Sequence, residues 1–523
     1  MKKYLKIITI GLLGFSMNSC TEDTIIDTKP FSGVAVEDAF STPAYIEASL
    51  NGVYNAAQIG QYNGTTPNGG RGYVWGAAFV QQGDCRGEDV VNLATFYDIT
   101  YSGTYDPATA NNVYYWIDGY RLINRCNIMI DGVNGAVAKG IITQAAANNY
   151  IGQVKFLRAI THFELLTYFS QPYNFTVGAT HPGIPYRVVG VDTLEEVDAE
   201  STKGRNTVAE CYDKIIADLN DAETLITQTA TKSKATKNAA IAFKTRVYLH
   251  KRDWDNVITE GNKLAGQFTL TPNPGDPFVT ANNLTNTESI FSIAHSSIFN
   301  PGVNAALASQ YKRRKLVCIS PIIWRDPSWL ADDKRRQEGS LVETGVGPGI
   351  AGLKFTNKYK DDVNYTDAAP VIRYAEVVLN MAEAHARKAA PDVTTSLTLL
   401  NSVRNRALAN PGAQAYTAAS FPTATDLVGA ILKERRIEFV MEGRRWSDIH
   451  RLQLDNLFPI NGIPAKITSA SNPPASAFTL GTPYSGPYGT PAIPGSDKRI
   501  LWPIPQLETN VSPILAAQQN PGW

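Results

Sequence analysis

The most charged part of the chain, residues 433–451, places carboxylates and arginines at helical spacing. On an unbroken helix, residues three or four positions apart share a face. Three carboxylates in a row on such a face could bind a metal ion or perform acid–base chemistry. Arginines interleaved three residues further on can instead pair with those carboxylates in bidentate fashion. We therefore predict a partly buried structural ion-pair network, in a helix that Gly443 could interrupt, made of Glu434, Arg435, Glu438, Glu442 and Arg445.

A second motif, at residues 347–352, matches the G-x-G-x-x-G pattern of dinucleotide-binding loops. That motif requires a strand before it and the start of a helix after it. Pro348 lies inside it and residues 353–359 are typical of an extended strand, so we predict a plain glycine-rich loop. The six histidines are dispersed. The sequence thus implies no metal centre and no cofactor, although loop oxygens could bind a structural calcium ion.

Composition excludes several classes of protein. The 523 residues include 48 Lys and Arg against 48 Asp and Glu, so the basic excess typical of nucleic-acid binding is missing. A hydrophobic content of 43% is too high for a disordered chain, and a mean hydropathy of −0.18 is too low for a multi-span membrane protein. Tyr (24) and Trp (8) together outnumber Phe (19), and such rings suit surfaces that are apolar on one side and wet on the other.

Cysteines add two constraints. Five in this length do not make a disulfide framework. Four of them are scattered, which excludes a zinc cluster but leaves open either buried thiols or one disulfide: Cys85, Cys126, Cys211 and Cys318.

The first twenty residues resemble a bacterial lipoprotein signal. Lysines at positions 2, 3 and 6 precede an apolar run at residues 7–15 that is too short to cross a bilayer, and Cys20 follows. We predict that residues 1–19 are removed and that Cys20 carries the lipid anchor. The alternative is an ordinary secretory signal cut elsewhere, or a short anchor. Acidic residues at 22 and 23 resemble the surface-export signal of Bacteroidetes lipoproteins.

The rest of the sequence predicts long helices separated by loops. Residues 150–169 are apolar on both faces, which indicates a buried helix. Alanine-lined helix pairs, typical of tetratricopeptide units, are predicted at 239–251 with 254–265 and at 373–387 with 396–409, and a last helix at 427–452. About 500 mature residues exceed one ordinary core. We expect an N-terminal region at 20–235 with a loop at 58–105, and a C-terminal region at 236–523 with loops at 268–367 and 461–498.

Several segments together resemble the SusD/RagB family of Bacteroidetes nutrient-capturing lipoproteins. They occur in family order at residues 51–54, 154–159, 372–384, 434–448, 501–505 and 519–523. The resemblance implies a mostly α-helical fold, in which tetratricopeptide-like pairs support an irregular, loop-rich ligand face. It also implies a non-catalytic glycan-binding protein, anchored in the outer membrane and facing the cell exterior, that acts as the lid of a SusC-like TonB-dependent transporter.

For the ligand site we expect two loop regions with aromatic rings and polar groups, because a sugar has an apolar face and a rim of hydroxyls. The candidate ligand-binding residues are Arg71, Tyr73, Trp75, Asp84 and Arg86 in the first region and Tyr311, Trp324 and Trp329 in the second.

Two other functions stay open. One is a binder of peptides or another non-glycan nutrient, as in the RagB branch; the basic run at residues 312–315 could suit anionic glycans or peptide carboxylates, or be a solvated loop. The other is a glycan-degrading enzyme with Asp84 and Asp326 as its carboxylate pair.

Overall fold

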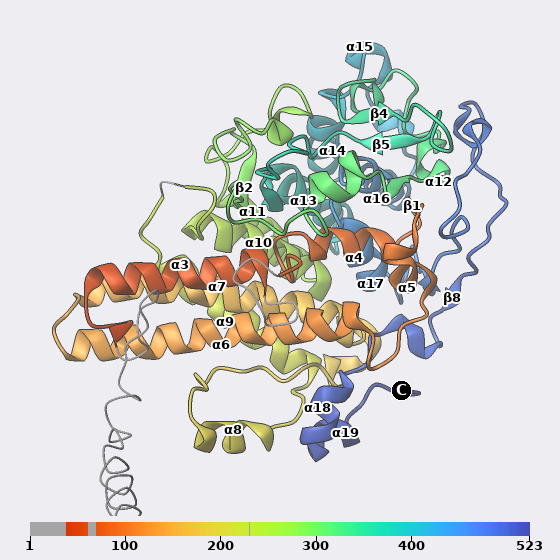
Figure 1. Cartoon of the computed structure of the whole chain (residues 1–523). Coiled ribbons are helices and arrows are strands. Elements are labelled where there is room, and N and C mark those ends of the chain that lie inside the picture. The colour runs from red at the N-terminus through yellow and green to blue at the C-terminus, as the bar shows by residue number, and fades with distance from the viewer. Residues whose placement is uncertain (1–37, 61–69, 230) are drawn as a thin grey trace, which may run out of the picture.

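The computed structural model describes residues 38–60, 70–229 and 231–523, and combines a helical arm with a rounded, loop-rich body (Figure 1). Four helices lie side by side in the arm: α3 (Pro43–Ile59), α6 (Ala110–Ala138), α7 (Gln144–Phe169) and α9 (Val208–Leu225). The predicted signal and Cys20 lie outside the described residues. Within the described ranges, no helix is long and apolar enough to cross a membrane.

The central helix of the arm, α7, is buried on nearly every side, as its sequence predicts. It begins where the Thr143 side chain accepts a hydrogen bond from the Ala146 amide, which satisfies one free donor of the first turn. Small residues allow its neighbours to approach closely: a Cβ atom added to Gly119 of α6 would lie 3.0 Å from the Leu165 side chain. The arm is therefore a tightly packed scaffold.

The two predicted helix pairs are present in the body. The first comprises α10 (Lys237–Lys251) and α11 (Trp254–Asn262), and the second α13 (Tyr374–Arg387) and α14 (Val393–Asn405). The predicted stripe of α13 packs into an apolar cluster with α14 and α16 (Ala424–Glu438). Shorter helices are α4 (Ala78–Arg86), α5 (Asp98–Ser102), α8 (Leu194–Ser201), α12 (Pro321–Trp324), α15 (Pro411–Gln414), α17 (Arg444–Arg451), α18 (Gln506–Val511) and α19 (Pro513–Ala517).

The prediction of one helix over residues 427–452 is wrong, because the chain breaks after α16. Gly443 has φ 73° and precedes α17, a left-handed conformation that glycine adopts without steric cost. A Cβ atom at Gly443 would lie 2.6 Å from the Val80 Cα atom, so the break also brings the backbone against α4. The charged segment therefore folds back on itself instead of presenting one straight face.

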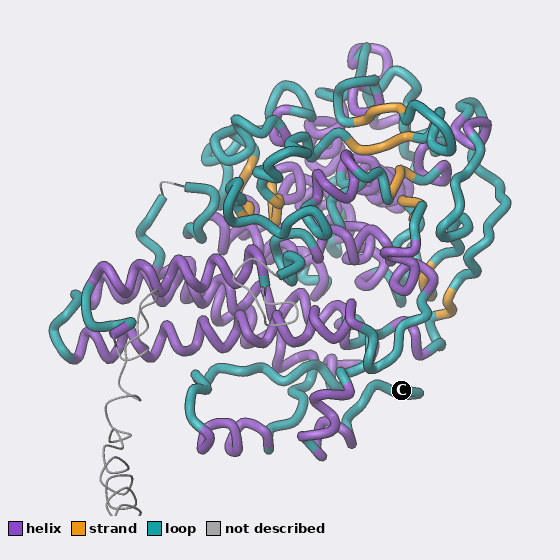
Figure 2. Tube along the Cα trace, viewed as in Figure 1, coloured by secondary structure: helices purple, strands orange, loops and turns teal. Residues whose placement is uncertain are grey.

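Strands in the described part of the chain are short and pair two by two, always antiparallel (Figure 2). The pairs are β1 (Val90–Asn92) with β3 (Val317–Ile319), β2 (Ser289–Ile293) with β6 (Ala369–Arg373), β4 (Val342–Thr344) with β5 (Lys354–Thr356), and β7 (Gly462–Ile463) with β8 (Ile493–Pro494). The glycine-rich motif connects β4 to β5, which confirms a loop at that position. The β1–β3 and β2–β6 pairs join points that lie far apart in the sequence, whereas β4 and β5 form a local hairpin.

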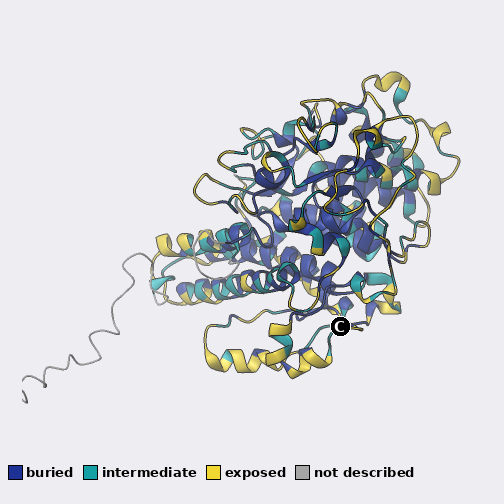
Figure 3. Cartoon of the chain, turned by 45° about the vertical axis from the view of Figure 1, so that its right-hand side comes forward, coloured by how far each residue is buried: buried dark blue, intermediate teal, exposed yellow. Residues whose placement is uncertain are grey.

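Buried residues lie in the interior of the arm and of the body, and exposed residues lie on their outside (Figure 3). The described cysteines, Cys85, Cys126, Cys211 and Cys318, are buried free thiols. Of the two possibilities that the sequence leaves open, buried thiols or one disulfide, the structure therefore supports buried thiols. Most of the buried apolar residues form one continuous core that extends from the arm into the body.

The predicted ion-pair network is present, but its partners differ from the expected ones. Glu438 pairs with Arg335, Arg373 and Arg406, none of which lies on its own helix. Arg435 pairs with Asp448, and Arg445 with Glu88. The reason is that the side of α16 that carries Glu434 and Glu438 is buried against other segments of the chain, and these segments supply the guanidiniums. The remaining pairs are Glu434 with Arg335 and Arg404, and Glu442 with Lys358 and Arg373.

Electrostatics keep this buried network charged. Burial by itself would raise the pKa of Glu438, but the charges of Arg406, Arg373 and Arg335 hold it well below its ordinary value. Arg373 is the centre of the network: its Nη1 atom lies 2.6 Å from Glu288 Oε1 and 2.7 Å from Glu438 Oε1. Removing one member would leave buried charges without compensation.

Replacing Arg373 with Met should lower the free energy of unfolding by about 3–5 kcal/mol, because three buried carboxylates lose a common partner. The midpoint of urea denaturation measures the effect. Asp213→Asn is the control: this 72%-exposed carboxylate pairs with Lys251 at 3.4 Å, and its loss should change stability by less than about 1 kcal/mol. Equal midpoints for the two variants would contradict the structural importance of the network.

Candidate functional site

Three long loops meet at the β1–β3 pair. Asn92 at the end of β1 lies opposite Val317 at the start of β3, and the Leu93 amide donates to the Leu316 carbonyl at 2.9 Å. The loop at 461–498 joins them, because the Ala470 amide donates to the Asn92 carbonyl at 2.9 Å. The structure thus brings together the two loop regions that the sequence singles out, and adds a third.

Most rings predicted to bind a ligand point inward. Trp75 is fully buried and its indole Nε1 donates to Thr161 Oγ1 at 3.0 Å. Trp324 donates to the Phe478 carbonyl at 3.0 Å, and Trp329 packs against the Arg336 guanidinium. Tyr73 and Tyr311 are equally enclosed. As ligand contacts these residues stay a prediction; in this structure their rings support the loops from beneath.

Arg86 is likewise an internal residue. Its guanidinium lies 3.8 Å from the Trp446 ring centroid, and the rings of Tyr105, Tyr168 and Trp502 complete a cage around it. Its Nη2 atom donates to the Ile500 carbonyl at 2.8 Å. The cation is held by π systems and backbone oxygen, an arrangement that stabilises a desolvated guanidinium.

Asp84 joins three segments beneath the loops. One carboxylate oxygen accepts a hydrogen bond from the Tyr311 hydroxyl at 2.8 Å, and the other accepts one from the Gly443 amide at 2.8 Å. Burial raises the pKa of Asp84 to about 7, because desolvation outweighs these hydrogen bonds. The residue is therefore a structural connection whose charge depends on pH.

The outer part of this region is centred on Phe96, which follows β1 and is partly buried against the core. The guanidinium carbon of Arg71 lies 5.5 Å from the Phe96 ring centroid, and that of Arg314, which precedes β3, lies 5.9 Å from it. Arg314 also donates to Asn304 at 3.5 Å, and Arg313 donates to the Tyr365 hydroxyl at 2.7 Å. We call this surface the Phe96 face; it comprises Arg71, Phe96, Phe299, Asn304, Arg313, Arg314 and Tyr365.

An exposed apolar loop borders the arginines. Phe299 is 47% exposed, and the neighbouring Ile298 and Val303 are also exposed. The loop is fixed at both ends, because Gln58 donates to the Phe299 carbonyl at 2.9 Å and Asn300 donates to the Ser296 carbonyl at 2.9 Å. A groove of about 530 Å³ runs beside it, lined by α3 and the loop, including Tyr54, Gln58, Lys234, His295 and Phe299.

Sequence reasoning missed Phe96, Phe299, Asn304 and Tyr365 as site residues. All four fall inside the predicted long loops, but composition and spacing do not distinguish a side chain that points into the core from one that points outward. The available signal was the basic run at 312–315, since two of its members, Arg313 and Arg314, are exposed on this face.

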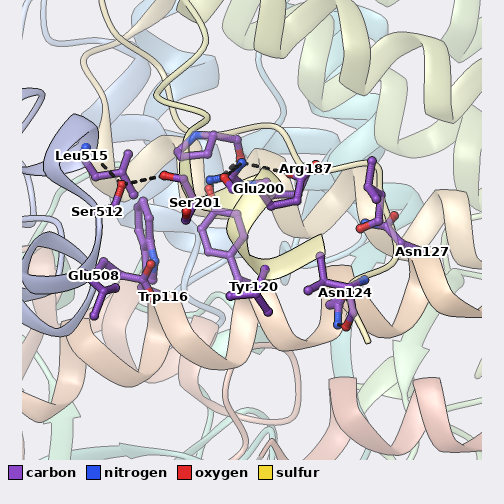
Figure 4. A pocket seen from close by; sticks show the side chains of 15 residues that line it. Trp116, Tyr120, Asn124, Asn127, Arg187, Glu200, Ser201, Glu508, Ser512 and Leu515 are labelled. Atoms are coloured by element: carbon purple, nitrogen blue, oxygen red, sulfur yellow. Dashed lines mark hydrogen bonds and ion pairs between the residues drawn. The ribbon is translucent and has the colours of Figure 1, made fainter. Parts of the chain in front are cut away.

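A second cavity of about 320 Å³ lies on the scaffold, between α6, the segment before α8, and α18 (Figure 4). Its walls are mainly apolar, with the rings of Trp116 and Tyr120 on α6. Its polar groups already bind within the chain: Tyr120 donates to the Pro185 carbonyl at 2.7 Å and Arg187 pairs with Glu200 at 3.0 Å. It therefore offers apolar contact but few free directional groups for recognising a sugar.

Comparisons with known proteins agree with this architecture. A family model described as "SusD family" matches residues 348–523, and one described as "Starch-binding associating with outer membrane" matches residues 81–249. The SusD-like protein P2 of Formosa agariphila is 25% identical over 88% of this chain and 93% of its own length. A SusD-like protein of Bacteroides ovatus is 23% identical over 86% of this chain and 82% of its own length.

Solved structures show the same fold. A SusD superfamily protein of Bacteroides fragilis superposes with a TM-score of 0.72 at 26% identity, covering 91% of this chain and 99% of its own. Surface glycan-binding protein A of Bacteroides uniformis superposes with a TM-score of 0.65 at 19% identity, covering 92% and 99%. A mostly α, tetratricopeptide-like scaffold that carries a loop-built face is thus the architecture of SusD-type proteins. The chain is similar to the SusD family in both matched segments and to SusD-like proteins over nearly its whole length.

The raised pKa of Asp84 predicts a pH-dependent stability. The unfolded carboxyl has a pKa of about 3.9, so its neutral form stabilises the fold below that pH, and this contribution is lost as pH rises through about 7. Asp84→Asn keeps the shape without the charge. Between pH 4 and 7 the free energy of unfolding of the wild type should therefore fall relative to that of Asp84→Asn, by on the order of 3 kcal/mol. Denaturation curves across that range test this, and parallel curves would contradict it.

Proposed function

We propose that this protein captures a glycan at the cell surface on its Phe96 face and delivers it to a SusC-like TonB-dependent transporter, which it covers as a lid. The observation that carries the proposal is the Phe96 face itself, where the exposed guanidiniums of Arg313 and Arg314 contact a phenol and an amide, and the amide, Asn304, lies at the end of an exposed apolar loop. The family descriptions support it, since one names starch binding and association with the outer membrane. The printed name of one structural relative is a surface glycan-binding protein.

Each part of the face suits one part of a sugar. The C–H side of a pyranose can pack on the exposed Phe299 ring. Guanidinium N–H groups and the Asn304 amide can donate to ring hydroxyls, and the Tyr365 hydroxyl can both donate and accept. Phe96 holds two guanidiniums by cation–π contact, so their donors are oriented before a ligand arrives. Such preorganisation reduces the entropy lost on binding.

The proposal is for binding without catalysis. The alternative of a glycan-degrading enzyme needs two carboxylates flanking an open cleft. Asp84 is buried and engaged by Tyr311 and Gly443, and Asp326 accepts a hydrogen bond from the Ser328 amide within its own turn. The arrangement of these two groups therefore does not favour that alternative.

Attachment to the outer membrane is part of the same proposal. The lipoprotein-type sequence that ends at Cys20 would place the chain on a membrane through acyl chains. A carrier tethered in this way remains next to its transporter, which raises the effective concentration of captured ligand there.

A glycan array identifies the glycan that a protein of residues 21–523 binds. Phe299→Ala should weaken binding of that glycan about five- to tenfold, because the sugar loses its aromatic contact. Isothermal titration calorimetry measures the change. Phe175→Ala is the matched control, since this ring is also 47% exposed but lies on a different part of the fold, and it should leave affinity unchanged. Equal affinities for both variants would place the glycan elsewhere, and binding of peptides instead of glycans would favour the RagB-type alternative.

Delivery to a transporter predicts a physical complex in the membrane. The full-length protein purified from its native outer membrane should bring a TonB-dependent barrel with it. Cys20→Ala should release the protein from the membrane fraction while glycan affinity in solution is kept. Purification of the wild type without any barrel would count against the lid role, and membrane retention of Cys20→Ala against the anchor.

A further inference from the structure

The Phe96 face is locally basic in a chain of zero formal net charge. Residues 289–325, which form its apolar loop and the start of β3, contain five Lys or Arg and no Asp or Glu. Residues 61–83, which include Arg71, also contain no acidic residue. Within these two segments every charged side chain is therefore basic, whereas the segments that carry Phe96 and Tyr365 also contain Asp98, Asp361 and Asp362.

Arg313 and Arg314 differ from most arginines of the body. Both are exposed, and their hydrogen bonds among the described residues end on a phenol oxygen and an amide oxygen. Neither forms an ion pair with a described carboxylate. By contrast, Arg335, Arg373, Arg406, Arg435, Arg436, Arg445 and Arg451 all pair with acidic groups.

Two carboxylates near this surface already have partners. Glu343 pairs with Lys315, the last member of the basic run. Asp361, close to Tyr365, accepts hydrogen bonds from the amides of its own loop, among them that of Asn364 at 2.9 Å. Neither carboxylate forms an ion pair with Arg313 or Arg314.

We propose that the Phe96 face selects an anionic glycan, one that carries carboxylate or sulfate groups along its chain. This inference rests on the proposed function and names the class of ligand for the same site. The guanidinium fork matches the paired oxygens of a carboxylate or sulfate, and such charge-assisted hydrogen bonds are about twice as strong as neutral ones. Neighbouring guanidiniums at positions 313 and 314 suit a polymer whose charge repeats.

The geometry leaves the required donors available. Each guanidinium has five N–H groups, and Arg313 and Arg314 use one each in the contacts described. The contact with Phe96 orients Arg314, and the hydrogen bond to Tyr365 orients Arg313. Anion binding therefore needs no rearrangement of the loops, and the surrounding positive field should also speed the approach of a polyanion.

Calorimetry with three probes tests the inference: oligogalacturonate for carboxylate, a κ-carrageenan oligosaccharide for sulfate, and maltoheptaose as the neutral sugar. At least one anionic probe should bind more tightly than maltoheptaose, and its affinity should fall about tenfold or more between about 50 and 300 mM NaCl as the charges are screened. Binding of one anionic probe and not the other identifies the anionic group. Tighter, salt-independent binding of maltoheptaose overturns the inference but leaves the proposed function intact.

Two double variants that remove the same charge test whether the anion binds at Arg313 and Arg314. Arg313→Gln combined with Arg314→Gln should weaken anionic binding at least about tenfold and flatten its salt dependence. Lys139→Gln combined with Lys237→Gln removes the same charge from exposed scaffold positions and should leave affinity unchanged. Equal losses in both double variants overturn the inference. If neither anionic nor neutral glycans bind, on the array or in solution, the proposed function fails with it.

Discussion

The buried contact between Arg373 and the carboxylates around it is the interaction on which the rest of this structure depends. It joins the end of β6 to the end of α16, and through Glu288 and Glu442 it reaches the start of β2 and the turn before α17. Charges this deep are tolerated only when each one is paired. The network therefore fixes the relative positions of elements whose apolar surfaces alone would allow several arrangements.

The network also helps to fix the loops at the surface. Gly443 follows the network and packs against α4, and its amide binds Asp84, which in turn holds Tyr311 beneath the Phe96 face. The rings of Trp75, Trp324 and Trp329 fill the space between scaffold and surface. A recognition surface made of loops can thus be rigid, because nearly every side chain beneath it is buried and hydrogen-bonded or packed.

Much of the scaffold was predictable from sequence, because helix periodicity and alanine-lined faces are local signals. The helices at 144–169, 237–251 and 374–387 follow their apolar patterns closely. Gly443 was recognisable as a residue that could interrupt the last helix, but the contact with α4 that accompanies the break involves residues far away in the sequence. The ion-pair partners of Glu438 could not be predicted for the same reason. Local spacing suggested arginines on one helix, whereas the partners lie on other segments of the chain.

The β1–β3 pair has a consequence for how this surface can change. Its strands hold the backbone of both loops, while Phe96 and Arg314 lie a few residues beyond their ends; Phe96 is partly buried against the core, and Arg314 is exposed. Under the proposed function, substitutions at exposed positions such as Arg313 and Arg314 would change which ligand binds without disturbing the pairing or the network behind it. The residues required for folding are thus different from those that the proposal assigns to recognition, so a lineage could exchange one nutrient for another by a few surface replacements.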